Sequence, residues 1–384
     1  MTVQQIYELT NNIAKETLGL TTVLSEDLSN IVDLGSEVFN TDNVDNYVKA
    51  LIDRIGKEVF VNRKYSGSVP SVLYDAWEFG SVLSKVEVEL PEATENESWE
   101  LTDGASYDSQ IFFKPSVTVR YFDSKVTFEI PYSIATKQLK ESFTNASTMN
   151  KFLSAIEGAV DKAMTIRTDG LVMRTINMMI AKTLATDIPT ANYGANSTIK
   201  AVNLLKLYND KFNQSLTRAN CLQTPEFVRF ASANIGITVE RMSKISTLFN
   251  IEGKPRFTPK DELHTVLLAD FVKYAEAYLQ SDTYHNEYTK LPNAETVPYW
   301  QGSGADYGLD SVSKIHVKVD ADTTVEATGI LGVCFDKYAL AVCNVDKRTT
   351  SAYSARGEFY SNYLKYDMQA IASTDENFVV FFVA

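Results

Sequence analysis

The longest regular hydrophobic pattern in the chain runs from about Ser147 to Asp187. Its apolar residues recur mostly at intervals of three and four, the spacing that places side chains on one face of an α-helix. They are Met149, Leu153, Ile156, Val160, Ala163, Met164, Leu171, Val172, Ile176, Met179, Ile180 and Leu184. Ser147 or Thr148 can cap the first turn, and Pro189 ends the helix. The pattern predicts one unusually long helix with a buried face, although an ordinary core helix is also consistent with it.

Two glycines lie inside this pattern. Gly158 and Gly170 each cost about 1 kcal/mol relative to alanine in a helix. We therefore expect a bend near Gly170 or the close approach of a neighbouring backbone. A division into two helices at residues 168–170 is the alternative.

The first sixty residues also show amphipathic spacing. Apolar residues at loosely helical intervals occupy residues 4–20 and, more clearly, residues 44–55, with polar and acidic turns between them. We expect two or three helices that form an N-terminal arm.

From Val82 the hydrophobic period changes to two, which is typical of strands. Apolar and charged residues alternate in residues 86–90, and similar runs occupy residues 117–121 and 126–130. The last two runs predict a β-hairpin, with the first strand paired nearby.

The segment between these strands, residues 91–110, contains six acidic residues, no Lys or Arg, and Trp99. Such a long segment without a regular pattern is commonly functional or disordered. We therefore interpret residues 82–131 as a projecting β-arm.

A mixed region follows the long helix. Helices are predicted within residues 199–212, 225–249 and 267–279. The start at Thr224-Pro225-Glu226 is the best marked, because it combines an N-cap, a proline at the first position and an acid in the first turn. Strands are predicted near residues 312–319, 330–335, 338–342, 368–372 and 378–383. The whole pattern predicts an α+β fold.

Composition narrows the functional classes. The 384 residues include 36 Lys and Arg against 49 Asp and Glu, and the resulting net charge of −13 argues against a surface that grips nucleic-acid phosphates. The three cysteines have no metal-type spacing, which favours a reducing compartment. The N-terminus lacks the pattern of a signal peptide, and no apolar run is long enough to span a membrane.

Candidate chemistry is sparse. His264, His285 and His316 are far apart in sequence, and neither a glycine-rich phosphate loop nor a nucleophile elbow is present. The acid pairs 261–262 and 375–376 lie where a helix start and a turn favour acids. We therefore predict no catalytic residues, no metal and no cofactor, and a protein that is not an enzyme.

One basic run stands out. Lys347, Arg348 and Arg356 are interleaved with tyrosines at positions 353, 360 and 363. Such a mixture could stack on RNA or contact an acidic neighbouring subunit. The net charge favours the second interpretation.

Three segments resemble a known family: residues 257–292, the sequence VPYWQGSG at 297–304, and the closing stretch from Asp336. They are similar to the Hong Kong 97-type major capsid protein of tailed bacteriophages. The order of arm, projecting loop, long helix, mixed domain and returning strands also resembles that family.

The resemblance implies a partition of the chain. It assigns residues 1–60 to an N-terminal arm and 80–131 to an extended loop. The peripheral domain would comprise residues 61–79, 132–189 and 349–384, and the axial domain residues 190–348. The long helix would be the spine, with its apolar face on the strand at 378–383.

The resemblance also implies a function. Copies of the chain would form pentamers and hexamers of an icosahedral shell, assembled in the bacterial host cytoplasm, around double-stranded DNA that is not bound sequence-specifically. A separate scaffolding protein, a portal and head-completion proteins would be partners, with no membrane involved. The candidate inter-subunit contacts are Glu92, Glu95, Glu97, Trp99, Glu100, Lys347, Arg348 and Arg356.

Two alternatives stay open at this point. One is an encapsulin-like nanocompartment that packages a cargo enzyme. The other is an enzyme or ligand-binding protein whose site is dispersed along the sequence.

Overall fold

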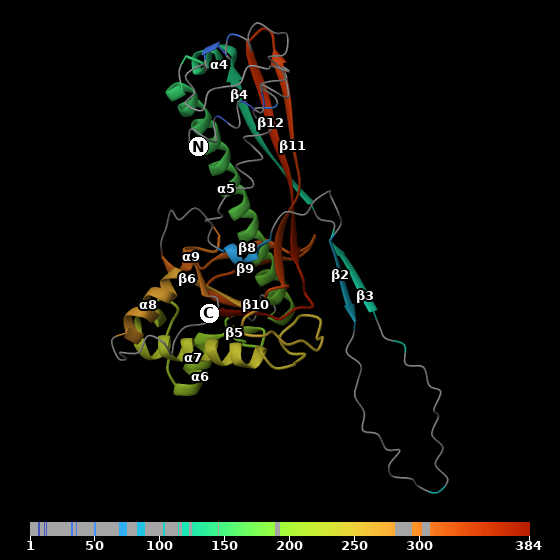
Figure 1. The fold of residues 1–384 in the computed structure, drawn as a ribbon. Coiled ribbons are helices and arrows are strands. Elements are labelled where there is room, and N and C mark those ends of the chain that lie inside the picture. The colour runs from blue at the N-terminus through green and yellow to red at the C-terminus, as the bar shows by residue number, and fades with distance from the viewer. Residues whose placement is uncertain are drawn as a thin grey trace.

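The computed structural model in Figure 1 describes residues 69–74, 83–88, 117–122, 125–144, 146–188, 193–280, 294–301 and 308–384, and a few isolated positions before residue 117. The helices predicted at residues 4–20 and 44–55 lie almost entirely outside these residues.

The helix α5 (Ala146–Asp187) is continuous over 42 residues, which confirms the predicted long helix. The alternative of two helices is wrong. A Cβ atom placed on Gly158 or Gly170 would meet nothing within 4 Å, so the expected close approach of another backbone is wrong as well. The helix continues through both glycines because its apolar residues are buried on either side of them, and tertiary packing outweighs local propensity.

A four-stranded sheet packs against α5. Its order is β1 (Leu73–Tyr74), β11 (Leu340–Ser354), β12 (Phe359–Ala372) and β4 (Lys125–Ala135). β1 is parallel to β11, and the other neighbours are antiparallel. Alternate residues of β12 are buried on the α5 side, among them Leu364, Tyr366 and Met368, while residues 359–367 of the opposite face are exposed or partly exposed. The short helix α4 (Thr136–Ser142) links β4 to α5.

The predicted hairpin of residues 117–130 is wrong in its pairing. β3 (Val117–Phe122) pairs with β2 (Leu83–Val88), whereas β4 pairs with β12 over eleven positions. The strands themselves were predicted correctly. β4 pairs elsewhere because its inward residues, such as Phe128 and Ile130, pack on the main core only when β4 lies beside β12.

A five-stranded sheet lies at the other end of α5. Its order is β5 (Ala201–Asn203), β13 (Phe378–Phe382), β10 (Ile330–Asp336), β6 (Leu263–Leu268) and β7 (Ala294–Val297). The predicted strands at 330–335 and 378–383 are confirmed. The helix predicted at 267–279 begins instead at Ala269, since residues 263–268 form β6.

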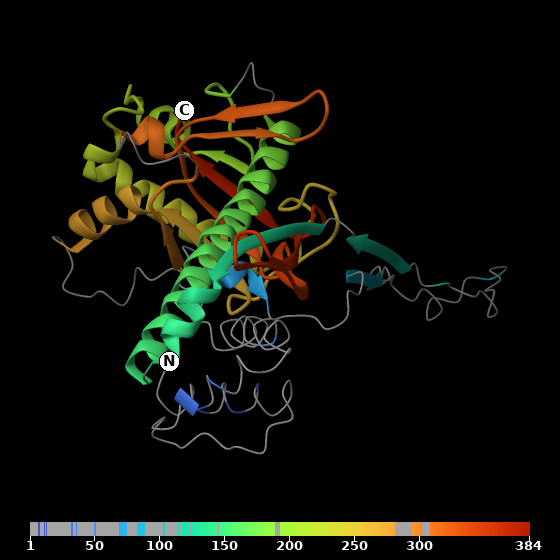
Figure 2. The ribbon, with the colours of Figure 1, turned by 90° about the horizontal axis from the view of Figure 1, so that it is seen from above.

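This second sheet is covered on both faces. Val333, Val380 and Phe382 share a core with α5, and this contact agrees with the expected packing of α5 on the last strand. The alternate residues face three helices, α6 (Leu204–Phe212), α7 (Pro225–Met242) and α8 (Ala269–Gln280). In Figure 2 the yellow-green and gold helices lie on one side of α5 and teal β4 lies on the other.

Smaller elements complete the described chain. They are the 3₁₀ turns at Pro70–Val72 and Cys221–Gln223, the helical turn α9 (Leu309–Val312), and the paired strands β8 (Ile315–Lys318) and β9 (Thr324–Ala327). Two elements cross the predicted domain limit at residues 348 and 349. β11 spans the limit, and β13 joins the sheet whose other strands come from residues 201–336. The partition itself stays a prediction.

Candidate functional site

The sequence-predicted contact residues fall into two groups. Glu92, Glu95, Glu97, Trp99 and Glu100 lie outside the described residues. The basic residues of the second group are all described, and the structure separates them.

Lys347 and Arg348 point to opposite faces of the four-stranded sheet because both lie in β11, where side chains alternate. Lys347 is opposite the buried Tyr366, whereas Arg348 lies on the solvent face. There Arg348 forms an ion pair with Asp367, at 2.8 Å, and another with Asp346, at 3.2 Å. The predicted basic run is therefore not one surface.

Arg356 is exposed in the turn between β11 and β12, at the tip of the sheet. The tyrosines are also divided. Tyr360 is buried, with its ring 4.9 Å from the ring of Tyr353, while Tyr363 is partly exposed on the solvent face of β12. These rings form no common stacking platform for nucleic-acid bases.

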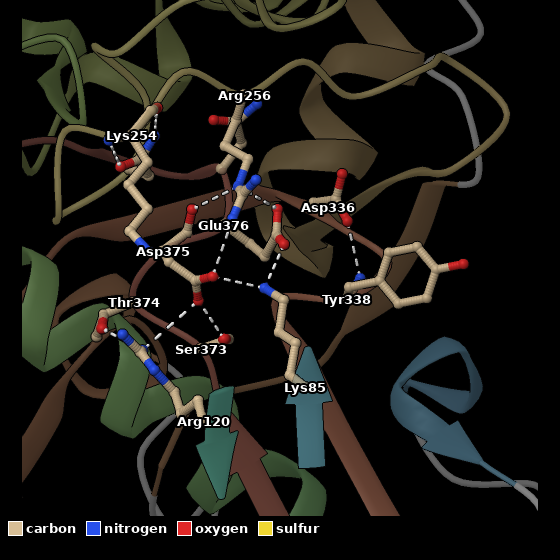
Figure 3. Close-up of polar contacts among 12 residues, drawn as sticks. Lys85, Arg120, Lys254, Arg256, Asp336, Tyr338, Ser373, Thr374, Asp375 and Glu376 are labelled. Carbon is tan, nitrogen blue, oxygen red and sulfur yellow. Dashed lines mark hydrogen bonds and ion pairs between the residues drawn. The ribbon is translucent and has the colours of Figure 1, made fainter. Parts of the chain in front are cut away.

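The most extensive polar site in the described chain lies at the base of the two-stranded ribbon formed by β2 and β3. In the antiparallel register Lys85 is directly opposite Arg120, so both side chains project from the same face of the ribbon. Figure 3 shows this face directed at the turn between β12 and β13, residues 373–377.

The two ribbon cations contact acids of the main body. The Nζ atom of Lys85 donates to Asp375 at 2.6 Å and also to Glu376. The guanidinium of Arg120 donates to both carboxylate oxygens of Glu252, at 2.6 and 2.8 Å, and lies 3.6 Å from Asp375. The ribbon base is thus held by one Arg120 nitrogen between the two oxygens of Glu252 and by a lysine between two acids.

A third cation completes the cluster. Arg256, from the loop that follows α7, contacts the Asp375 carboxylate at 3.1 Å and Glu376 at 3.5 Å. The Asp375 side chain is only 2% exposed, so its charge depends on these partners rather than on water. We call Lys85, Arg120, Glu252, Arg256, Asp375 and Glu376 the ionic cluster.

The acids of the ionic cluster have opposite pKa shifts. Burial raises the pKa of Asp375, but hydrogen bonds from Lys85 and Ser373 and the charge of Lys85 and Arg120 outweigh it and hold the pKa well below its usual range. Burial raises the pKa of Glu252 too, and hydrogen bonds from Thr374 and Arg120 bring it below its ordinary value. At Glu376 burial prevails over the lowering by Lys85, and the pKa is raised.

The sequence did not indicate this site. Asp375 and Glu376 were interpreted as acids of a turn, which accounts for their position in the chain but does not predict their burial. The available signal was the position of Lys85 and Arg120 within strands that otherwise alternate apolar residues. The ionic cluster connects the base of the ribbon to the turn at residues 373–377 and to the loop that follows α7.

The other face of the ribbon carries exposed apolar side chains. Val117, Val119 and Tyr121 are 53%, 42% and 68% exposed, and we call them the apolar stripe. Their neighbours Thr118, Arg120 and Phe122 are less exposed, on the face that carries the cluster. A strand normally turns its apolar face to its own core, whereas no described residue of this chain covers the apolar stripe.

Other chemistry has little support in the described part of the chain. It contains no group of three or more metal-ligating side chains and no helix long and apolar enough to cross a bilayer. Its three cysteines are buried, and burial raises the pKa of Cys221 to about 11, which makes the thiol unreactive.

An elongated α+β subunit, with a ribbon anchored by ions and an apolar stripe turned outward, belongs to the class of structural proteins that pack against other chains. The comparisons with known proteins specify this class. Residues 9–382 match the family described as Phi29-like phage major capsid protein, and the chain belongs to this family.

The family confirms the resemblance to phage major capsid proteins. The chain is a non-enzymatic component of the virion capsid and forms the icosahedral shell. The two alternatives, a nanocompartment with an enzyme cargo and an enzyme with a dispersed site, are therefore set aside.

Solved structures of phage capsids are also similar to this chain. The capsid of Staphylococcus phage Andhra is 9% identical with a TM-score of 0.49, and the match covers 84% of this chain and 86% of that one. The mature capsid of bacteriophage PhiM1 is 10% identical with a TM-score of 0.44, with 84% and 89% covered. The capsid of cyanophage P-SCSP1u is 12% identical with a TM-score of 0.43, with 82% and 86% covered. No curated protein matches the chain.

Proposed function

We propose that this subunit builds pentamers and hexamers by laying its β2–β3 ribbon on a neighbouring copy. The observation that carries the proposal is the exposed apolar stripe on a ribbon whose charged face is held by its own body. A two-stranded ribbon is marginally stable in water by itself. Burial of the stripe against a neighbour would stabilise both the ribbon and the assembly.

The proposal also includes the DNA that the shell encloses and the other head proteins that act with it. The net charge of −13 suits a container that encloses double-stranded DNA without binding its sequence. A separate scaffolding protein, a portal and head-completion proteins are the expected partners. Well-formed shells assembled from this chain alone would contradict the need for a scaffolding protein.

The proposed partition of the chain stays as the resemblance implied it. The arm would be residues 1–60 and the extended loop 80–131. The long helix would be the spine helix of the peripheral domain. Arg356 and the acidic residues of the extended loop remain candidate inter-subunit contacts, together with Lys347 and Arg348.

The proposal is tested by moving one charge between the faces of the ribbon. Val119→Asp places a carboxylate in the apolar stripe, and Thr118→Asp places it one residue away on the opposite face. Each variant is expressed with the phage's other head proteins, and shells are counted by electron microscopy after sedimentation. We expect Val119→Asp to give soluble subunits with at least tenfold fewer shells, and Thr118→Asp to assemble as wild type. Equal shell yields for the two variants would contradict the proposal.

A further inference from the structure

The loop between α7 and β6 is firmly fixed. Ser246 and Arg256 exchange two backbone hydrogen bonds of 2.8 and 3.0 Å across it. Inside this pair the Asn250 side chain donates to Lys254 O at 2.6 Å and accepts from Lys254 N at 2.8 Å. Phe249 is buried, and its carbonyl accepts from Phe378 N of β13. A loop held this way presents a defined surface.

That surface is apolar. Ile245, Leu248 and Phe257 are 60%, 54% and 56% exposed. Ile245 and Phe257 flank the Ser246–Arg256 pair. Because neighbouring residues of paired strands alternate in direction and Arg256 points inward to the ionic cluster, Ile245 and Phe257 point away from the body. Large apolar side chains gathered on a rigid surface loop commonly mark a protein contact.

The loop is also basic, against the charge of the chain as a whole. Residues 241–260 contain five Lys and Arg and one acid. Arg256 pairs within the ionic cluster, and Lys260 pairs with Glu240 at 2.5 Å. Arg241 and Lys244 are exposed and make no ion pair within the described residues. Together with Ile245, Leu248 and Phe257, they form what we call the loop patch.

The same chain contains a segment of complementary composition. Residues 91–110 carry six acids, no Lys or Arg, and Trp99. They belong to the connection between the outer ends of β2 and β3, Val88 and Val117. Residues 89–116, drawn out and back, could reach about 45 Å from the ribbon, which is far enough to contact an adjacent subunit.

We propose that the loop patch is the receptor for residues 91–110 of a second copy of this chain. The acids of the segment pair with Arg241 and Lys244, while Trp99 packs on Ile245, Leu248 and Phe257. Opposite charges at the rim give orientation and partner choice, and a buried aromatic residue supplies much of the affinity. The inference rests on the proposed contact of the ribbon with a neighbour, and it names the surface that receives the ribbon's acidic connection.

This contact joins two different surfaces, so it is heterologous. A heterologous contact repeated between identical chains generates a ring when the rotation closes. Pentamers and hexamers are such rings. Binding of residues 91–110 to the loop patch of their own chain is the competing arrangement, and it would generate no ring.

Cysteine bridging separates the two arrangements. Ser98→Cys and Thr247→Cys place thiols beside Trp99 and within the loop without removing any proposed contact. The native cysteines are buried and do not compete. Purified shells of the double variant are treated with a short bis-maleimide and analysed on denaturing gels. We expect a ladder of covalent oligomers, and Ser98→Cys paired with Ile166→Cys, an exposed position on α5, should give none.

Every other result overturns the proposal. A bridge confined to single chains would show that the segment binds its own loop. Thiols that react only singly, or a ladder of equal strength with Ile166→Cys, would show that the loop patch is not the receptor. If Val119→Asp abolishes shells but no ladder forms, the role of the ribbon stands and only this receptor is wrong. If Val119→Asp assembles normally, the ribbon proposal fails independently of the ladder.

Charge exchange gives a second readout. Arg241→Glu with Lys244→Glu should reduce shell yield at least tenfold, and so should Glu95→Lys with Glu97→Lys. The four substitutions in one chain should restore the yield to within about twofold of wild type, because the attraction is re-formed with reversed signs. A combined variant no better than either pair would overturn the electrostatic contact.

Discussion

Asp375 is the residue on which anchoring of the ribbon depends most. Its side chain is 2% exposed, and its carboxylate forms ion pairs with Lys85 at 2.6 Å, Arg256 at 3.1 Å and Arg120 at 3.6 Å. Asp375→Asn preserves the shape of the side chain but removes the charge. The perturbation leaves three cations facing a neutral amide, with Glu376 and Glu252 as the remaining acids.

The expected magnitude follows from burial. Removing one partner of a buried ion pair costs about 3–5 kcal/mol, because the other partner is left uncompensated. Here the cations are 19–32% exposed and regain some hydration, so we expect about 3 kcal/mol. That is roughly a 150-fold change in the equilibrium that the cluster controls.

Hydrogen exchange on unassembled subunits measures this effect locally. Amides of β2 and β3 should lose about 3 kcal/mol of protection in Asp375→Asn, while those of β10 and β13 lose much less. Asp367→Asn is the matched control, since Asp367 pairs with Arg348 at the surface, where an ion pair contributes at most about 1 kcal/mol. The reasoning is refuted if the two variants differ by less than 1 kcal/mol in β2–β3 protection.

Three further predictions concern stability. Gly329 has φ +85°, and an added Cβ would lie 2.0 Å from Val383 O, so Gly329→Ala should cost at least about 2 kcal/mol in denaturant unfolding; a change under 0.5 kcal/mol would disprove the strain. Asn203 caps α6 by accepting from Lys206 N and donates to Ala384 O at 3.0 Å, so Asn203→Ala should cost about 1–2 kcal/mol by the same assay, and no loss would disprove the cap. The pKa values of Asp375 and Glu252 are lowered from their ordinary values of 3.8 and 4.5, so the stability that their ionised forms give the ribbon is complete above those values and is lost as the pH falls below them. The pKa of Glu376 is raised, so its contribution is complete below the ordinary value of 4.5 and is lost as the pH rises through the raised pKa. Exchange protection of β2–β3 should therefore decline below about pH 4, and a constant value down to pH 3 would contradict this.

Elements with strong local signals were predicted well. α5, β10 and β13 have continuous apolar patterns, and α7 begins at the marked Pro225. The predicted helix continuing to residue 249 nevertheless ends at Met242, and the following residues form the loop to β6. The class of protein could be predicted from the sequence because these elements follow one another in the same order as in the family that the chain resembles.

Elements that depend on distant partners were predicted poorly. β11 and β12 continue through Lys347, Arg348 and Lys365 because one face of their sheet is solvated, and a charged run does not resemble a strand. Leu267 and Leu268, the last two residues of β6, were interpreted as the start of a helix because a short apolar run has no distinguishing period. The ionic cluster unites residues about 290 positions apart, and no local pattern reports that Asp375 and Glu376 become buried against Lys85.

The position of β13 between β5 and β10 has a consequence for the time course of synthesis. β5 is made about 175 residues before β13, and at about 5–20 residues per second the ribosome needs roughly 10–35 s to cover that distance. Until residues 378–382 emerge, the backbone N–H and C=O groups of β5 and β10 that pair with β13 are unpaired, and they can form hydrogen bonds with other nascent chains. The turn that holds Asp375 and Glu376 is made in the same late interval, so the contacts of Lys85 with these two acids cannot form earlier. A subunit can therefore join a shell only after β13 has been inserted between β5 and β10. Folding of each chain is in this way separated in time from assembly, even when several ribosomes translate the same messenger RNA.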